Sequence, residues 1–266
     1  MKQEVKKILG LSLISFKTKL VYKTNSLIIL LSGIITALVQ FYLWTSVEQS
    51  SLGSNTDIDS IILYTLMSIL VNLLLPTKEV ADYFSKLIYK GDIMTVMMHP
   101  YSLFNHIFFY QIGNSLFVLC FEFIPLLLAF IVFFPIKINV LLQYRIIIFI
   151  ISFIISYISS IIIGYMIGLM AIYTTTVKGI FEFYNAMLIF LGGSIFPLII
   201  YPKGLAFIAN YMPFYSIVGA PLSIVSGISD NYIYIILKQV FWVGILIFLV
   251  MYLNKKNIKN LSIMGG

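Results

Sequence analysis

The stretch "YRIIIFIISFIISYISSIIIGYMIGLMAI", residues 144–172, decides the fold class of this chain. Arg145 is its only charged residue, and isoleucine, phenylalanine and tyrosine make up most of the remainder. The hydrocarbon core of a bilayer is about 30 Å thick and an α-helix rises about 1.5 Å per residue, so about 20 apolar residues are enough to cross it. The stretch therefore predicts a transmembrane helix.

Small residues recur at every fourth position along one ridge of this predicted helix. They are Ser152, Ser156, Ser160, Gly164 and Gly168. Small side chains on such a ridge let a second helix backbone approach closely. The ridge predicts a helix-packing surface, and its partner is either another helix of this chain or a helix of a second subunit.

The whole chain has the composition of an integral membrane protein. Of its 266 residues, 61% are hydrophobic, 16% are aromatic and 10% are charged, which lies outside the range of soluble domains. Six apolar segments are long enough to cross a bilayer, and we expect them at residues 26–45, 58–75, 104–134, 144–172, 181–200 and 232–253. We predict an all-α polytopic membrane protein in which residues 1–266 form a single transmembrane domain.

The distribution of positive charge indicates how the spans are oriented. Lysines precede the first span and follow the second, fourth and sixth, whereas the loop after the first span contains no cation. Cytoplasmic loops retain Lys and Arg, so this pattern favours both termini in the cytoplasm. The net charge of +7 then reflects topology and attraction to anionic lipid, and nucleic-acid binding is the poorer explanation.

The first 24 residues are basic and amphipathic. Most lysines lie opposite a stripe of residues three or four apart, which are Val5, Ile8, Leu9, Ser12, Phe16 and Leu20. This pattern is typical of a helix that lies in the plane of the membrane interface. We predict such an interfacial helix over residues 1–24, with a frayed basic tail as the alternative.

The segment at residues 76–103, between the second and third spans, is predicted to be cytoplasmic. Within "YKGDIMTVMMHPYS", residues 89–102, Asp92 follows Gly91 as a helix N-cap and Pro100 ends the helix. Ile93, Val96 and Met97 form an apolar stripe on this short helix. The stripe either docks on a partner protein or rests on lipid headgroups.

Prolines interrupt the apolar segment that follows the fifth span. Pro197, Pro202, Pro213 and Pro221 exclude one continuous spanning helix. We predict two short helices over residues 197–227 that enter the outer leaflet and return, with an ordinary extracellular loop as the alternative. Four aromatic residues are predicted to form an apolar outer gate here: Phe196, Phe207, Tyr211 and Phe214.

Isolated polar residues lie within or beside the predicted spans. Glu122 lies deep in the third span, and we expect a buried structural carboxylate that is protonated or paired with Lys238; a substrate or proton role is the alternative. His99 and His106 are expected to make interfacial hydrogen bonds, because they lack the neighbours of a metal site. Cys120 is the only cysteine and is expected to pack as a small hydrophobic residue.

Taken together, these features resemble the membrane subunit of a bacterial ABC-2 type ABC transporter. The first motif that carries the resemblance comprises Ile88, Gly91, Asp92, Ile93 and Pro100. The second comprises Gly193, Pro197, Leu198, Tyr201, Pro202, Pro213, Phe214, Pro221 and Gly227, and the chain ends in Gly265 and Gly266.

The resemblance implies a permease subunit of an ATP-driven exporter in the bacterial cytoplasmic membrane. Its partners would be two copies of an ATP-binding subunit, which carry ATP and Mg, and a second membrane subunit, identical or homologous. Residues 89–102 would then contain the coupling helix that docks on the ATP-binding subunit. No catalytic, cofactor-binding or metal-ligating residue is predicted on this chain, whose sequence contains no Gly-rich nucleotide loop. A proton-coupled secondary transporter and a membrane scaffold or signalling subunit are the alternatives.

Overall fold

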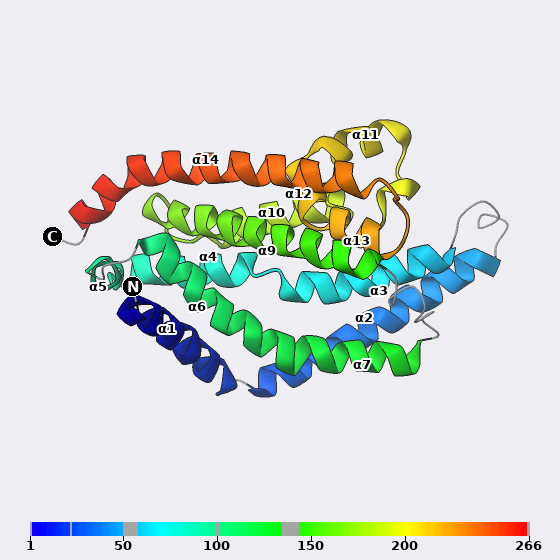
Figure 1. Cartoon of the computed structure of the whole chain (residues 1–266), viewed down its shortest axis with the longest axis horizontal. Coiled ribbons are helices and arrows are strands. Elements are labelled where there is room, and N and C mark those ends of the chain that lie inside the picture. Colours follow the sequence, from blue (N-terminus) through cyan, green and yellow to red (C-terminus); the bar gives the residue numbers. More distant parts are fainter. Residues whose placement is uncertain (1, 22, 50–57, 99–101, 135–143, 265–266) are drawn as a thin grey trace.

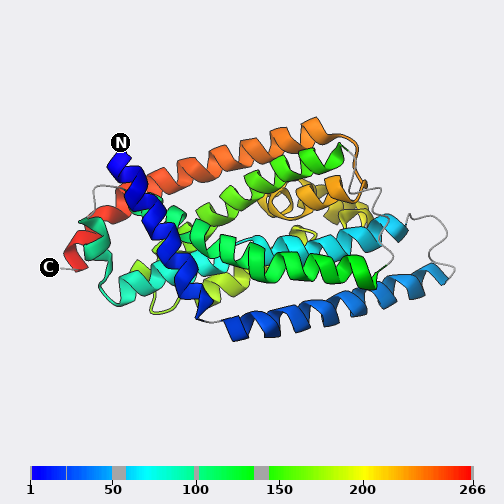
Figure 2. The same cartoon turned by 60° about the horizontal axis from the view of Figure 1, so that its bottom comes forward.

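The computed structural model describes residues 2–21, 23–49, 58–98, 102–134 and 144–264. All regular secondary structure in these residues is helical. The long helices run side by side along one axis (Figures 1 and 2). They are α2 (Lys23–Gln49), α3 (Ile58–Leu74), α4 (Thr77–Tyr89), α6 (Leu103–Val118), α7 (Ile124–Phe133), α9 (Arg145–Leu169), α10 (Lys178–Leu191) and α14 (Tyr232–Met264).

The other described elements connect and cover these helices. They are α1 (Lys2–Leu20), α5 (Ile93–Met97), the π-helix η2 (Leu119–Phe123), the 3-10 helices η3 (Met170–Ile172) and η4 (Leu198–Ile200), α11 (Lys203–Tyr211), α12 (Pro213–Ile217) and α13 (Gly219–Val225). The start of α1, the end of α14 and α5 all lie at one end of the molecule (Figure 1).

Five helical segments of the described chain are long and apolar enough to cross a membrane. They run over Thr24–Glu48, Ile58–Tyr89, Leu103–Phe133, Arg145–Ile172 and Tyr232–Lys255. These segments correspond to five of the six predicted spans, so the described part of the chain has the helical architecture of a multi-pass membrane protein.

The predicted fifth span, residues 181–200, does not form one helix. Helix α10 ends at Leu191, because Gly193 takes a positive φ of 69° that L-residues rarely adopt and Pro197 follows soon after. With 14 residues, α10 is about 21 Å long, shorter than a bilayer core. The prediction was therefore wrong about the end of this helix.

Residues 76–103, the predicted cytoplasmic segment, contain the helix α4 in addition to the predicted short helix, and their placement relative to the membrane stays a prediction. Pro76 breaks the second span, but the chain continues as α4 in line with α3 (Figure 1). Three residues on one face of α4 are buried: Val80, Ala81 and Phe84. This amphipathic face packs on α9 and keeps α4 within the bundle.

Helix α9 lies at the centre of the fold, and its small-residue ridge contacts helices of the same chain. A side chain at Gly164 would meet the carbonyl oxygen of Thr77 at 2.5 Å, and one at Gly168 would meet Phe84. Ser152 donates a hydrogen bond of 2.8 Å to Gln239 on α14. Ser160 is fully buried. The ridge therefore packs against α4 and α14, and Ser156 also donates to the carbonyl oxygen of Ser216 on α12.

Helix α1 packs against α6. The hydroxyl of Ser12 donates to the carbonyl oxygen of Phe109 at 2.7 Å, and a side chain at Gly113 would overlap the Ser12 backbone. The ring of Phe16 packs edge-on against Phe117, with centroids 6.0 Å apart. The later part of the predicted stripe therefore faces α6, while its placement in the membrane interface stays a prediction.

The proline-rich segment after α10 forms short helices of two kinds. Helices α12 and α13 are buried against α9, α3 and α14, and Pro221 lies in the first turn of α13. Helix α11, which begins just after Pro202, is largely exposed. Pro213 is the first residue of α12, where a missing N–H costs nothing. Pro197, Pro202 and Pro213 thus stand at the starts of elements, whereas Pro221 lies within the first turn of one.

Candidate functional site

A cavity of about 480 Å³ lies between α2, α3, α4 and α10, where Pro76 separates α3 from α4. Polar side chains from all four helices and the turn after α10 line it: Thr36, Gln40, Ser68, Asn72, Thr77, Lys78, Glu79, Tyr184, Asn185 and Ser194. Polar groups in a membrane bundle are costly and mark substrate or ion pathways. This cavity is therefore the candidate functional site.

Hydrogen bonds fix the shape of the cavity wall. The amide nitrogen of Asn72 donates to the Ser68 carbonyl at 2.8 Å and to the Ser194 hydroxyl at 3.0 Å. The hydroxyl of Tyr64 donates to the carbonyl of Gly193 at 2.7 Å. These bonds attach the turn after α10 to α3, so the wall is built from segments more than 100 residues apart in sequence.

Two charged residues lie on the cavity at the start of α4. Lys78 places its ammonium group 5.9 Å from the centroid of the Phe181 ring, a distance at which a cation is attracted to an aromatic face. Glu79 follows directly and also lines the cavity. The site therefore carries a lysine and a glutamate at adjacent positions.

The predicted docking helix forms as α5, but its stripe does not face outward as a whole. Ile93 and Val96 are only 4% and 7% exposed, and Ile93 packs with Val80 and Phe84. The exposed apolar side chains are Met97 and Met98, at 37% and 84%. The prediction was wrong about the direction of Ile93 and Val96.

The ends of α5 agree in part with the sequence. Gly91 has a φ of 76°, which explains a glycine there. Asp92 occupies the N-cap position but makes no side-chain capping bond; Thr95 instead donates to its carbonyl oxygen at 2.6 Å. Pro100 and His99 lie outside the described residues.

Glu122 is buried on the π-helix η2 and pairs with the start of α2. Its carboxylate accepts a hydrogen bond of 2.7 Å from Ser26. Lys238 instead donates to the carbonyl oxygen and the side-chain oxygen of Asn210, at 2.7 and 2.6 Å. The predicted Glu122–Lys238 pair was therefore wrong, because the two residues lie on elements that pack against different helices.

The Lys238 bonds connect α14 to the last turn of α11. Its ammonium group also lies 4.8 Å from the centroid of the Tyr215 ring. A cation at a helix C-terminus satisfies carbonyl groups that the helix leaves unpaired. Lys238 thus holds the exposed helix α11 against the bundle.

The four predicted gate aromatics do not form one cluster within the chain. Phe207 and Tyr211 pair with each other on α11, with ring centroids 5.0 Å apart. Phe196 packs on Trp44 of α2, and Phe214 packs on Tyr184 of α10. Phe196, Phe207 and Tyr211 are exposed, so they remain available to a partner surface.

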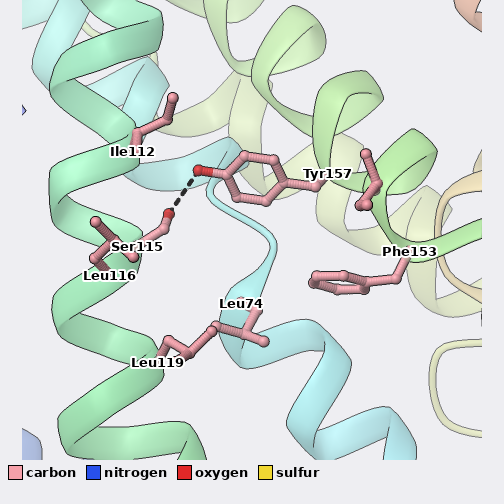
Figure 3. Close-up of a pocket in the computed structure, with 8 residues that line it drawn as sticks. Leu74, Ile112, Ser115, Leu116, Leu119, Phe153 and Tyr157 are labelled. Carbon is pink, nitrogen blue, oxygen red and sulfur yellow. Dashed lines mark hydrogen bonds between the residues drawn. The ribbon is translucent and has the colours of Figure 1, made fainter. Parts of the chain in front are cut away.

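A second groove, between α6 and α9, has a different chemistry (Figure 3). Its volume is about 230 Å³, and its lining is apolar except for Ser115 and Tyr157. The Tyr157 hydroxyl donates to Ser115 at 2.8 Å, as the dashed line in Figure 3 shows. Because these two hydroxyl groups bond to each other, the groove presents an apolar surface that suits lipid chains.

Two other singled-out residues lie outside these cavities. His106 shares a hydrogen bond of 3.0 Å with the Tyr83 hydroxyl, in agreement with the predicted hydrogen bonding. Cys120 is exposed on η2, so it faces away from the core of the chain.

A comparison with protein families assigns most of the sequence. The model of the ABC-2 family transporter protein matches residues 31–265. The chain belongs to the ABC-2 transporter family. A comparison with curated proteins gives no match. As a member of the ABC-2 family, the chain is a multi-pass permease subunit of an ABC transporter.

Sequence reasoning missed the polar lining of this ABC-2 permease. Lys78 and Glu79 belong to the segment predicted to be cytoplasmic, and the neighbouring Val80, Ala81 and Phe84 show the spacing of a buried helix face. Gln40, Asn72 and Asn185 are amides within apolar segments. Amides within apolar segments indicate a polar site in the bundle. Only the tertiary structure shows that these three side chains line the same cavity.

Proposed function

We propose that this chain is the membrane subunit of an ATP-driven exporter in the bacterial cytoplasmic membrane, with both termini in the cytoplasm. The observation that carries the proposal is a cavity lined by polar side chains of four helices of the bundle. A scaffold or signalling subunit would need no such path. A second membrane subunit, identical or homologous, completes the path, and two copies of a separate ATP-binding subunit with ATP and Mg drive it.

The cycle we propose is one of alternating access. Closure of the ATP-binding subunits on nucleotide moves the face around α5 and tilts the helices that line the cavity. Because α4 joins α5 to the cavity and packs on α9, movement at α5 has a short, rigid route to Lys78 and Glu79. Helix α11 acts as the lid at the opposite end of the molecule (Figure 1).

Replacing Glu122 with Gln is expected to leave transport within about threefold of wild type. The carboxylate accepts one hydrogen bond from Ser26, and the amide oxygen of Gln accepts the same bond. Transport into inverted vesicles at constant ATP should also continue when an uncoupler collapses the proton gradient. A dead Glu122→Gln variant, together with loss of wild-type transport on adding the uncoupler, would favour the proton-coupled transporter.

Cysteines at Leu205 and Ile208 test whether α11 is a moving lid. Both side chains are exposed on the helix that Lys238 holds at its end. In a Cys120→Ser background, we expect labelling by a membrane-impermeant maleimide to differ several-fold between nucleotide-free and ATP-trapped complexes. Equal labelling in both states, whether fast or slow, would remove the lid role. Labelling from the cytoplasmic side alone would contradict the orientation.

A further inference from the structure

Helix α3 ends and helix α4 begins on the wall of the polar cavity, where Pro76 interrupts the helical chain. We propose that this break binds a zwitterionic group of the substrate, one that carries both an ammonium and an anionic oxygen group. The inference rests on the proposed function as a transport subunit and names the class of molecule that its cavity admits.

The two helix ends at the break present backbone groups of opposite polarity. The first helical bond of α4 runs from the Val80 N–H to the Pro76 carbonyl. Within the described residues, the N–H groups of Thr77 and Lys78 make no backbone bond, and Pro76 supplies no side-chain cap. The last carbonyl groups of α3 likewise lie beyond the reach of its own N–H groups. A broken helix in a membrane bundle can therefore receive an anion at one end and a cation at the other.

Two side chains of opposite charge stand at the start of α4. Lys78 and Glu79 both line the cavity, and neither makes an ion pair with another residue in the described part of the chain. Adjacent residues on a helix point about 100° apart, so these two side chains do not face each other. Each can therefore meet a ligand charge of the opposite sign.

The charged groups around Glu79 balance one another. Glu79 interacts electrostatically with Lys19 of α1 and with Asp82, one turn later on α4, as well as with Lys78. A purely anionic ligand near Lys78 also meets the carboxylate of Glu79, and a purely cationic ligand near Glu79 also meets the ammonium of Lys78. A zwitterion can place each of its charges beside the opposite one, so it gains at both positions.

Two buried polar atoms on the cavity need partners of opposite kinds. Tyr184 is only 7% exposed, and its hydroxyl has no hydrogen-bond partner among the described residues, since Thr77 lies beside it outside bonding geometry. The side-chain oxygen of Gln40 is also buried without a donor from these residues. Tyr184 can donate to an anionic oxygen, and Gln40 can accept from an ammonium N–H. A ligand with both groups satisfies both atoms.

The remaining polar lining offers neutral donors and acceptors. The amide nitrogens of Gln40 and Asn185 are donors on the same cavity. Thr36 and Ser68 donate their protons to carbonyl groups of their own helices, which leaves their oxygens as acceptors. The cavity volume of about 480 Å³ lies within the range of about 300–1,000 Å³ that is usual for small-molecule sites. Both parts of a zwitterionic group therefore find partners here.

The test compares four amphiphiles that share a decyl chain and differ in head: decylphosphoethanolamine, decyl phosphate, decylammonium and decyl maltoside. The full chain with Cys120→Ser is placed in nanodiscs of phosphatidylglycerol, which brings no ammonium group. Modification by a neutral methanethiosulfonate reagent is followed at Ile189→Cys and Ile195→Cys on the cavity wall. Leu116→Cys in the apolar groove of Figure 3 is the control for partitioning into lipid.

At equal concentrations, we expect decylphosphoethanolamine to slow modification at both cavity sites about tenfold, and the other three amphiphiles to slow it less than about twofold. All four should act alike at Leu116→Cys. Glycerophosphoethanolamine carries the same head without the decyl chain and distinguishes the sources of the zwitterion. Protection by this molecule indicates a soluble substrate, and protection by the decyl compound alone indicates a lipid headgroup.

Charge-neutralising variants assign the two ligand charges to their positions. Lys78→Gln should weaken protection by decylphosphoethanolamine about tenfold and favour decylammonium over decyl phosphate, whereas Glu79→Gln should weaken it similarly and reverse that preference. Tyr184→Phe should raise the concentration for half-protection about three- to tenfold. Lys86→Gln on α4 and Glu182→Gln on α10 are the matched controls, because both residues are exposed and lie outside the cavity lining.

Equal or better protection by decyl phosphate, decylammonium or decyl maltoside, or none by decylphosphoethanolamine at both cavity sites, would overturn the inference. Lys78→Gln and Glu79→Gln variants that change the charge preference no more than their controls would overturn it as well. Association with an ATP-binding subunit is measured separately on the same preparations. If protection is as expected but no ATP-binding subunit associates, the proposed function fails while the ligand class stands.

Discussion

Replacing Gly164 with Val is expected to destabilise the bundle by about 3 kcal/mol, at the upper end of the cost of overpacking a core. A side-chain carbon at this position would lie 2.5 Å from the Thr77 carbonyl oxygen and 2.8 Å from Val80. The first of these atoms is backbone, so it cannot rotate away as a flexible side chain would. Helix α4 must shift as a whole, and the cavity wall beside Thr77 shifts with it.

The free energy of unfolding in mixed detergent micelles measures this effect. Gly244→Val is the matched control, because Gly244 lies in the spanning helix α14 and nothing stands within 4 Å of an added side-chain carbon. An unfolding free energy for Gly164→Val equal to that of the control would show that α4 does not pack on α9 in this way.

Replacing Met97 or Met98 with Asp is expected to weaken association with the ATP-binding subunit at least about tenfold, because an unpaired carboxylate in an apolar groove is costly. Both methionines are exposed at the end of α5, and methionine suits a contact that must adapt as the partner moves. A helix face resting on lipid headgroups would tolerate the same change. Copurification of the ATP-binding subunit in detergent is the measurement.

Two further variants separate docking from folding. Met98→Leu keeps an apolar side chain at the exposed position and should retain the partner. Val96→Asp should instead lower the yield of folded protein, because Val96 is only 7% exposed in the chain itself. Undiminished copurification and transport in both Met97→Asp and Met98→Asp would remove the docking assignment from α5.

The candidate docking site illustrates what a pattern of apolar spacing leaves open. The spacing of Ile93, Val96 and Met97 indicates that one face of a short helix is covered. It does not say by what, and here the chain's own cluster around Val80 and Phe84 covers Ile93. The covering group depends on where α4 and α9 lie, which is information from distant segments.

The sequence by itself determined the class of this protein and most of its spans, because apolar length is a local property that the bilayer thickness directly constrains. It also located the breaks, since proline and glycine act on their own backbone. Only the tertiary structure decided the partners. The Gly164 ridge faces α4, Glu122 pairs with Ser26 some 96 residues away, and amides from three helices meet in one cavity. Such pairings depend on how helices pack together. The spacing of residues within one helix does not indicate which helix packs beside it.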